Sequence, residues 1–281
     1  MRIEYEDRDI IVVYKEAGLP VQTGRTSGRD LVSMLKNHLA KETENAASAG
    51  GGSGQASKKN GAAGRQQQER HGAGKALSGN GPQEPYLGIV HRLDQPVEGL
   101  LVFAKTPKAA ADLSRQTAAK GADAAVTKNR ISSGKKDAPK DSGMEKIYHA
   151  AVVLSGDAYP LALEGRKRDV TLTDWILRDY ANNTALITEE GAKDAKRAEL
   201  TFRTLEIKGS RALVEIRLHT GRHHQIRVQM AHAGMPLAGD RKYGSADPQD
   251  RQLCLCAARL GFRHPRTGKR MQFQVQEGFS I

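Results

Sequence analysis

The sequence has few cysteines and no long apolar run. Only two cysteines, Cys254 and Cys256, occur in 281 residues, which excludes a disulfide framework and is typical of a reducing cytoplasm. Two thiols are also too few for a structural zinc site, and their alternation in "QLCLCA" predicts small buried residues of a strand. No segment has the ~20 apolar residues of a transmembrane helix, and no early stretch resembles a signal peptide. We therefore expect a cytoplasmic protein without a membrane partner.

Acidic residues are outnumbered by basic ones. The chain has 44 Lys and Arg against 32 Asp and Glu, with a net charge of +12 and a pI of about 9.7. This surplus predicts a polyanionic partner, most simply nucleic acid. Fingerprints of nucleotide cofactors are missing, because the Gly-rich stretch at 50–54 has no strand before it and no helix after it. We expect no cofactor, and neither an NTPase nor a nicotinamide enzyme.

Two stretches are poor in residues that could be buried, at 42–84 and at 118–143. Both are rich in small and polar residues, and such a composition does not offset the entropy lost on ordering. We expect them to be flexible inserts in loops. The remaining length is suitable for one domain, and no internal repeat occurs, so we predict a single domain over 1–281.

The other segments have clear strand or helix patterns. Strands are predicted at 10–14, at the continuous apolar run 99–104, and in "EKIYHAAVVLSG" and "RAELTFRTLEIKGSRALVEIRLHTG". Helices are predicted from Asp30 to Leu39, from a Thr106 cap through Leu113, and in "RHHQIRVQMAHAG", with a final hairpin turning at 265–268. Strands outnumber helices and lack a regular helix crossover. This predicts an α+β fold with a mixed, mainly antiparallel sheet flanked by helices.

Asp94 is the carboxylate whose position most needs an explanation. It lies in "HRLDQPVEGLLVFAKT", in a loop that leads directly into the buried strand. It could stabilise a turn or pair with Arg92, or it could be a catalytic carboxylate. Its spacing alone leaves both interpretations open.

Histidine and arginine gather near residue 224. His219, His223, His224 and His232 match no standard set of metal ligands, so we expect hydrogen bonds to RNA or to neighbouring loops and no metal site. Arg222 and Arg227 lie near a predicted helix start, where they form either an anion trap or a solvated basic face. Arg227 stands between two apolar residues and therefore needs a carboxylate partner, for which Asp94 is a candidate.

Tyr148, in "KIY", also has two interpretations. It could be an ordinary core residue, or its ring could lie over an unstacked base.

Three segments in order resemble the RluA-type pseudouridine synthases. "HRLDQPVEGLLVFAK" is similar to the HRLD loop of this family and its following strand, "KIYHAAV" to its Lys-x-Tyr strand, and "LHTGRHHQIRVQMAHAGMPLAGDRKYG" to its Thr-Gly-Arg-x-His-Gln-Ile-Arg segment. The resemblance covers nearly the whole ordered chain. It implies the pseudouridine synthase fold, an isomerase that converts uridine to pseudouridine in rRNA or tRNA, and no cofactor or metal. We expect no counterpart of the small N-terminal S4 domain that some relatives have, and we expect a monomer.

The resemblance also implies roles for individual residues. Asp94 matches the catalytic aspartate, Tyr148 the active-site tyrosine, and Arg227 the arginine that pairs with the aspartate and lowers its pKa. Arg92 matches the arginine that helps to fill the gap left by the flipped base. The same motifs imply further RNA contacts from Arg222, His224 and Gln225.

The chain departs from the family pattern at a few positions. Val97-Glu98 replaces Thr-Ser, Gln229 replaces a common histidine, and Glu16 replaces a common proline. Two rival functions follow from these residues. One is a catalytically silent RNA-binding protein of the same fold. The other is a base hydrolase in which Asp94 and Glu98 form a carboxylate pair.

Overall fold

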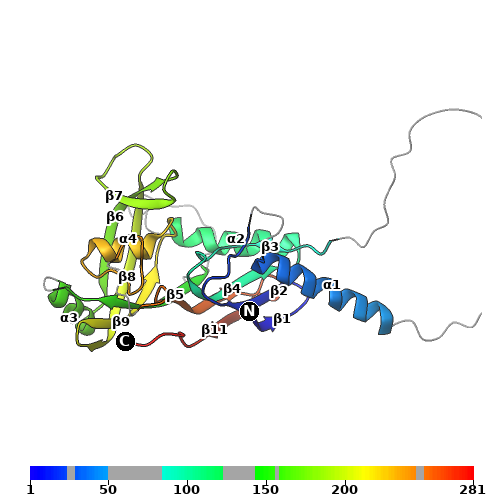
Figure 1. The fold of residues 1–281 in the computed structure, drawn as a ribbon. Helices are drawn as coiled ribbons and strands as arrows, with labels where there is room; N and C mark the ends of the chain where they lie inside the picture. Colours follow the sequence, from blue (N-terminus) through cyan, green and yellow to red (C-terminus); the bar gives the residue numbers. More distant parts are fainter. Residues whose placement is uncertain (24–28, 50–83, 123–142, 156–157, 245–249) are drawn as a thin grey trace, which may run out of the picture.

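An 11-stranded sheet forms the body of the protein in a computed structural model, which describes residues 1–23, 29–49, 84–122, 143–155, 158–244 and 250–281 (Figure 1). The strands are β1 (Arg2–Glu6), β2 (Ile10–Lys15), β3 (Gly88–Ile89), β4 (Glu98–Ala104), β5 (Glu145–Val153), β6 (Val170–Asp179), β7 (Thr184–Thr188), β8 (Lys196–Lys208), β9 (Arg211–Leu218), β10 (Leu255–Arg263) and β11 (Arg270–Gln274). The helices are α1 (Leu31–Ala49), α2 (Pro107–Ala122), α3 (Tyr159–Lys167) and α4 (Gln225–His232).

The strands follow the order β1-β2-β4-β10-β5-β9-β8-β6-β7, with β11 paired to β10 and β3 to β4. Within the described ranges, β4 with β10 is the parallel pair and the other pairs are antiparallel. The predicted α+β class with a mixed, mainly antiparallel sheet is confirmed. The β4–β10 pairing also places the loop before β4 two strands away from β5, near the middle of the sheet.

The two faces of the sheet bury different helices. Leu31 and Leu35 of α1 pack with one set of β2 and β4 side chains, and Leu113 of α2 packs with the alternate set. Successive strand side chains point to opposite faces, so all residues of β4 are buried, as its apolar run predicts. Ile226 and Met230 of α4 join the cluster that contains the α1 side chains. Helices α1 and α4 therefore cover the same face.

The local signals at helix and hairpin ends are confirmed. Thr106 accepts a hydrogen bond from the backbone N–H of Ala109 through its hydroxyl at 3.2 Å, and α2 begins at Pro107. Gly268, with φ of 69°, closes the turn between β10 and β11. Both cysteines are free thiols and buried. The β6–β7 hairpin and α3 were not predicted.

The predicted bounds of the two inserts are wrong at their starts. Helix α1 continues to Ala49 and α2 to Ala122, so residues 42–49 and 118–122 are helical. Alanine, glutamate and lysine dominate these segments, and they prolong an existing helix at little cost even where nothing is buried. The rest of both predicted inserts, 50–83 and 123–142, lies outside the described residues. The prediction of a single domain over 1–281 stays a prediction.

None of the helices described is long and apolar enough to cross a membrane.

Candidate active site

A cavity of about 440 Å³ opens where three segments of the chain meet. They are the loop before β4, the first residues of β5, and the segment that leads into α4. The side chains that line it and matter most below are Asp94, Tyr148, Arg222, His223, His224 and Arg227. The structure thus brings together three motifs that are far apart in the sequence.

The loop that carries Asp94 is held from both ends. The backbone N–H of Val97 donates to the carbonyl of Asp94 at 3.0 Å, which forms a tight turn, and both Leu93 and Val97 are buried in the core. The chain thus turns at Asp94 through its backbone, and among the described residues the carboxylate makes no hydrogen bond that would stabilise this turn. The Asp94 side chain is 34% exposed and faces the cavity. No ion pair joins it to Arg92 in the part of the chain that the structure describes.

Lys15 is a component of this loop that the sequence reading missed. Its side chain is fully buried, and its Nζ donates to the carbonyls of Gln95 at 3.0 Å, Leu19 at 2.8 Å and Glu16 at 3.1 Å. Burial lowers the pKa of Lys15 to about 8. It is the only charged residue in the strand "IIVVYK", and this position could have indicated in the sequence that its side chain has a specific role. It ties the end of β2 to the Asp94 turn.

Arg227 forms its hydrogen bonds with Asp240, a residue that the sequence reading had not considered as its partner. Its Nε and Nη2 donate to the two carboxylate oxygens of Asp240 at 2.8 and 2.7 Å, and both side chains are buried. Its Nη1 lies 3.9 Å from Asp94 Oδ2, at the outer limit of an ion pair. The expected pair of Arg227 with Asp94 is present only as this long contact, and the hydrogen bonds of Arg227 go to Asp240. A guanidinium has five donors, and Asp240 uses one edge of this one and leaves Nη1 toward Asp94.

The pKa of Asp94 is shifted in the direction opposite to the expected one. Burial raises it above the usual value, and the charges of Arg227, His223, Lys15 and Lys242 only partly offset this. The cause is burial, which disfavours the charged carboxylate more than these cations favour it, although Arg227 is the strongest of them.

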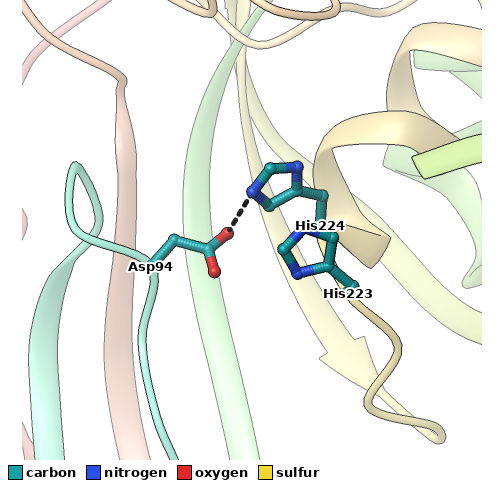
Figure 2. Close-up of side chains that lie close together, drawn as sticks. All are labelled: Asp94, His223 and His224. Atoms are coloured by element: carbon teal, nitrogen blue, oxygen red, sulfur yellow. Dashed lines mark ion pairs between the residues drawn. The ribbon is translucent and has the colours of Figure 1, made fainter. Parts of the chain in front are cut away.

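His224 lies beside the carboxylate rather than at the rim. Its Nε2 is 3.5 Å from Asp94 Oδ2, and its Nδ1 is 2.7 Å from the hydroxyl of Tyr243 (Figure 2). Burial lowers the pKa of His224 to about 3, so the ring is neutral at neutral pH. His223 stacks on His224 with 3.9 Å between ring centroids, and burial lowers its pKa too. The sequence reading had proposed RNA contacts for His224 and had not connected either ring with Asp94.

Tyr148 is an ordinary core residue, as one interpretation predicted, and its place over an unstacked base stays a prediction. It is a buried member of the core on β5, and it also lines the cavity. Burial raises the pKa of its hydroxyl, which stays protonated at neutral pH.

Arg92 and Arg222 are exposed and line the rim of the cavity. Arg222 precedes α4, whose N-cap is His224, and its Nε donates to the carbonyl of Arg197 at 3.0 Å. The predicted trap of two arginines at a helix start is therefore wrong, because Arg222 lies outside the helix and Arg227 is paired inside it.

The amide of Gln225 is used inside the protein. It donates to the carbonyl of Glu199 and to Gln229, and it accepts from the hydroxyl of Thr220 and the N–H of Arg222. These bonds shape the segment before α4. A contact of Gln225 with RNA stays a prediction, and in this structure the side chain has no free hydrogen-bonding group.

Glu98 does not line the cavity. Its carboxylate accepts from the hydroxyl of Tyr14 at 2.9 Å and from the N–H of Gly278 at 2.7 Å, on the face of the sheet that buries α2. A carboxylate pair of Asp94 and Glu98 is therefore not present, and the hydrolase interpretation loses its basis.

Comparison with known proteins agrees with the motifs. Residues 9–232 match the model of a family described as RNA pseudouridylate synthase. The RNA pseudouridine synthase YlyB of Bacillus subtilis is 32% identical over 277 residues, which cover 97% of this chain and 68% of that protein. The ribosomal large subunit pseudouridine synthase D of Zymomonas mobilis is 33% identical over 216 residues, which cover 73% of this chain and 57% of that protein. The chain thus spans only part of the length of these relatives.

A solved structure, titled human RNA pseudouridylate synthase domain containing 4, has a similar fold. It superimposes with a TM-score of 0.60 at 17% identity, covering 98% of this chain and 88% of that one. The predicted fold family is confirmed.

Proposed function

The chain belongs to the RNA pseudouridylate synthase family, and on that premise we propose that it converts uridine to pseudouridine in ribosomal or transfer RNA with Asp94 as its catalytic carboxylate. One observation carries the assignment of the site. The Asp94 carboxylate faces the same cavity as Tyr148 of β5 and lies 3.9 Å from the guanidinium of Arg227 at the start of α4.

The reaction makes three demands on such a site. The N1–C1′ glycosidic bond must break, the uracil must turn while it stays bound, and it must be rejoined through C5. The uridine has to leave its stack first, at a cost of a few kcal/mol, because its reacting atoms are not accessible within a helix. The cavity of about 440 Å³ beside Asp94 has room for one flipped nucleotide.

Asp94 acts as the ionised carboxylate. It either attacks covalently or assists the loss of the 2′ proton. Arg227 orients it through Nη1, and Asp240 holds Arg227 in place. The Tyr148 ring, which cannot move from the core, supplies a face for the uracil, and its protonated hydroxyl can relay a proton.

The exposed arginines at the rim contact the RNA backbone and help to fill the gap that the flipped base leaves in the stack. Arg92 and Arg222 are exposed and line the cavity, which suits a role in RNA binding. Their contacts with phosphates should make affinity fall as salt rises. His224 lies next to Asp94 and lines the same cavity, so its contact with the bound RNA stays a prediction.

The target class and setting are proposals of the same kind. Relatives named ribosomal large subunit pseudouridine synthases, types C and D, make the large-subunit rRNA the first substrate to test. We place the protein in the cytoplasm as a monomer, because its two cysteines are free thiols and its target is RNA.

The test measures pseudouridine formed on bulk RNA by the wild type and by Asp94→Asn. The wild type should form product and the variant should form none. Equal product from both, or none from the wild type, would contradict the proposal. The second outcome is the one expected of a silent RNA-binding protein.

Glu98→Gln is the matched control. It removes a buried carboxylate four residues from Asp94 that lies outside the cavity, so it should keep product formation above that of Asp94→Asn. Free uracil released from RNA, and lost equally in both variants, would instead support the hydrolase.

A further inference from the structure

His223 has a buried nitrogen without a partner. Its Nε2 makes no hydrogen bond in the part of the chain that the structure describes, although the ring is bonded to the backbone of Asn183. The nitrogen that bonds to the Asn183 carbonyl is therefore Nδ1, which carries the proton. Nε2 then holds a lone pair, and a buried acceptor of this kind calls for a ligand.

His224 offers a second nitrogen in the same place. Its Nδ1 is bonded to the Tyr243 hydroxyl at 2.7 Å, and that hydroxyl also accepts the N–H of Ala185 at 2.7 Å. A hydroxyl both donates and accepts, so Tyr243 supports either tautomer of the ring. When Nδ1 carries the proton, His224 Nε2 presents its lone pair toward Asp94.

The three groups converge. Asp94, His223 and His224 each offer one ligand atom, and these atoms lie within 4.8 Å of one another. Ligand atoms around tetrahedral zinc, at about 2.0–2.1 Å from the metal, lie roughly 3.4 Å apart. Asp94 Oδ2 and His224 Nε2, at 3.5 Å, already have this separation. His223 stacks on His224 with 3.9 Å between ring centroids, so it has to turn out of that stack to aim Nε2 at the same ion (Figure 2).

We propose that Asp94, His223 and His224 form a site for a divalent transition-metal ion such as Zn²⁺, and that its occupancy inhibits the enzyme. The inhibitory part rests on the proposed function, because a metal-bound Asp94 carboxylate cannot act on uridine. Two imidazoles and one carboxylate suit Zn²⁺ or Co²⁺ better than Mg²⁺, which prefers oxygen ligands. Asn183 and Tyr243 serve as the outer partners that orient the two rings.

The surrounding charges favour a site of moderate rather than extreme affinity. Arg227, although it is bonded to Asp240, is the strongest of the positive charges that act on Asp94, and Lys15 and Lys242 add to it. The site is open to solvent through the cavity, so RNA and the metal compete for it. The ion therefore acts as a reversible inhibitor and not as a cofactor.

The other two histidines of this region do not take part in the proposed metal site. His219 is bonded to Thr201 and His232 to Asp174, both away from the cavity. His232 thus provides a matched control, since its side chain is 58% exposed and lies at the far end of α4, the helix that His223 and His224 precede. Replacement of His223 by phenylalanine keeps a ring stacked on His224 and removes only the ligand.

The experiment has two independent measurements on metal-free protein. Co²⁺ is titrated and its visible absorption recorded, and Zn²⁺ affinity is measured by competition with a chromophoric chelator. Separately, pseudouridine formation is measured at buffered free Zn²⁺, with each variant normalised to its own metal-free rate. Wild type and His232→Phe should show the Co²⁺ band and lose at least tenfold in rate, reversibly on chelation. His223→Phe should bind Zn²⁺ at least tenfold more weakly and resist inhibition by the same factor.

A wild type without the Co²⁺ band, or His223→Phe with an unchanged band, would overturn the metal site. A band that depends on His223 together with a rate insensitive to Zn²⁺ would overturn the inhibition. If the metal-free wild type forms no pseudouridine, the proposed function fails, while the Co²⁺ titration still decides whether the site exists.

Discussion

Asp240 and Arg227 form the interaction whose removal should have the largest measurable effect near the site. Asp240 is fully buried, Arg227 is 5% exposed, and two hydrogen bonds of 2.8 and 2.7 Å join them. Asp240→Asn keeps the shape of the side chain but leaves a buried guanidinium uncompensated. Breaking such a pair on one side costs about 3–5 kcal/mol. With a urea m-value of about 2 kcal/mol/M, this is a midpoint shift of roughly 2 M.

A double variant separates the unpaired charge from simple loss of contacts. Asp240→Leu with Arg227→Met removes both charges and leaves apolar groups of similar size. Its free energy of unfolding should exceed that of Asp240→Asn, because no charge is left buried alone. Urea denaturation of the three proteins at pH 7 measures both effects. A loss below about 1 kcal/mol in Asp240→Asn, or a double variant less stable than it, would refute the reasoning.

The same variant should also change the pH dependence of turnover. In the wild type, Asp240 offsets part of the charge that Arg227 presents to Asp94. Without that carboxylate, the guanidinium lowers the pKa of Asp94, so the acidic limb of the single-turnover rate should move to lower pH. An acidic limb unchanged in Asp240→Asn would mean that Arg227 does not act on Asp94 through its charge.

Three further predictions concern neighbouring groups. Burial raises the pKa of Asp94, so on acidification the single-turnover rate should begin to fall at a pH above the usual titration range of aspartate. In denaturation experiments, Asp94→Asn should be more stable than the wild type at pH 7, where the buried carboxylate is charged, but not below about pH 4, where it is neutral. The pKa of Lys15 is about 8, below its unfolded value, so the wild type should gain about 2–3 kcal/mol over Lys15→Met between pH 7 and pH 10. If the stability difference between the two proteins did not change with pH, the hydrogen bonds to the three carbonyls would be keeping Lys15 protonated despite its burial. Gly99 has a φ of 118°, and an added Cβ would lie 2.5 Å from the backbone of Ala257. Gly99→Ala should therefore lower the free energy of unfolding by at least about 2 kcal/mol, measured by thermal or urea unfolding. Gly221→Ala is the control, because a Cβ there would have open space, and it should change stability little. Equal stability of these two glycine variants would contradict that account.

Local pattern was sufficient for much of the fold. The apolar run of β4, the alternation in β9 and the caps at Thr106 and Gly268 depend on contacts a few residues long, and all of them are as predicted. The helix extensions to Ala49 and Ala122 were missed because burial was used as the criterion for order. Helix propagation needs no burial once the helix has begun.

The sequence by itself determined the family, the order of its motifs, and Asp94, Tyr148 and Arg227 as the side chains of one site. Motifs identify residue types, and these three do line one cavity. The partners of each charge were decided only by the tertiary structure. Asp240 holds Arg227, Lys15 holds the Asp94 turn, and His223 and His224 lie against the carboxylate. The physical reason is that a buried charge takes whichever group the fold brings within about 3 Å, and that choice depends on packing between segments far apart in the chain.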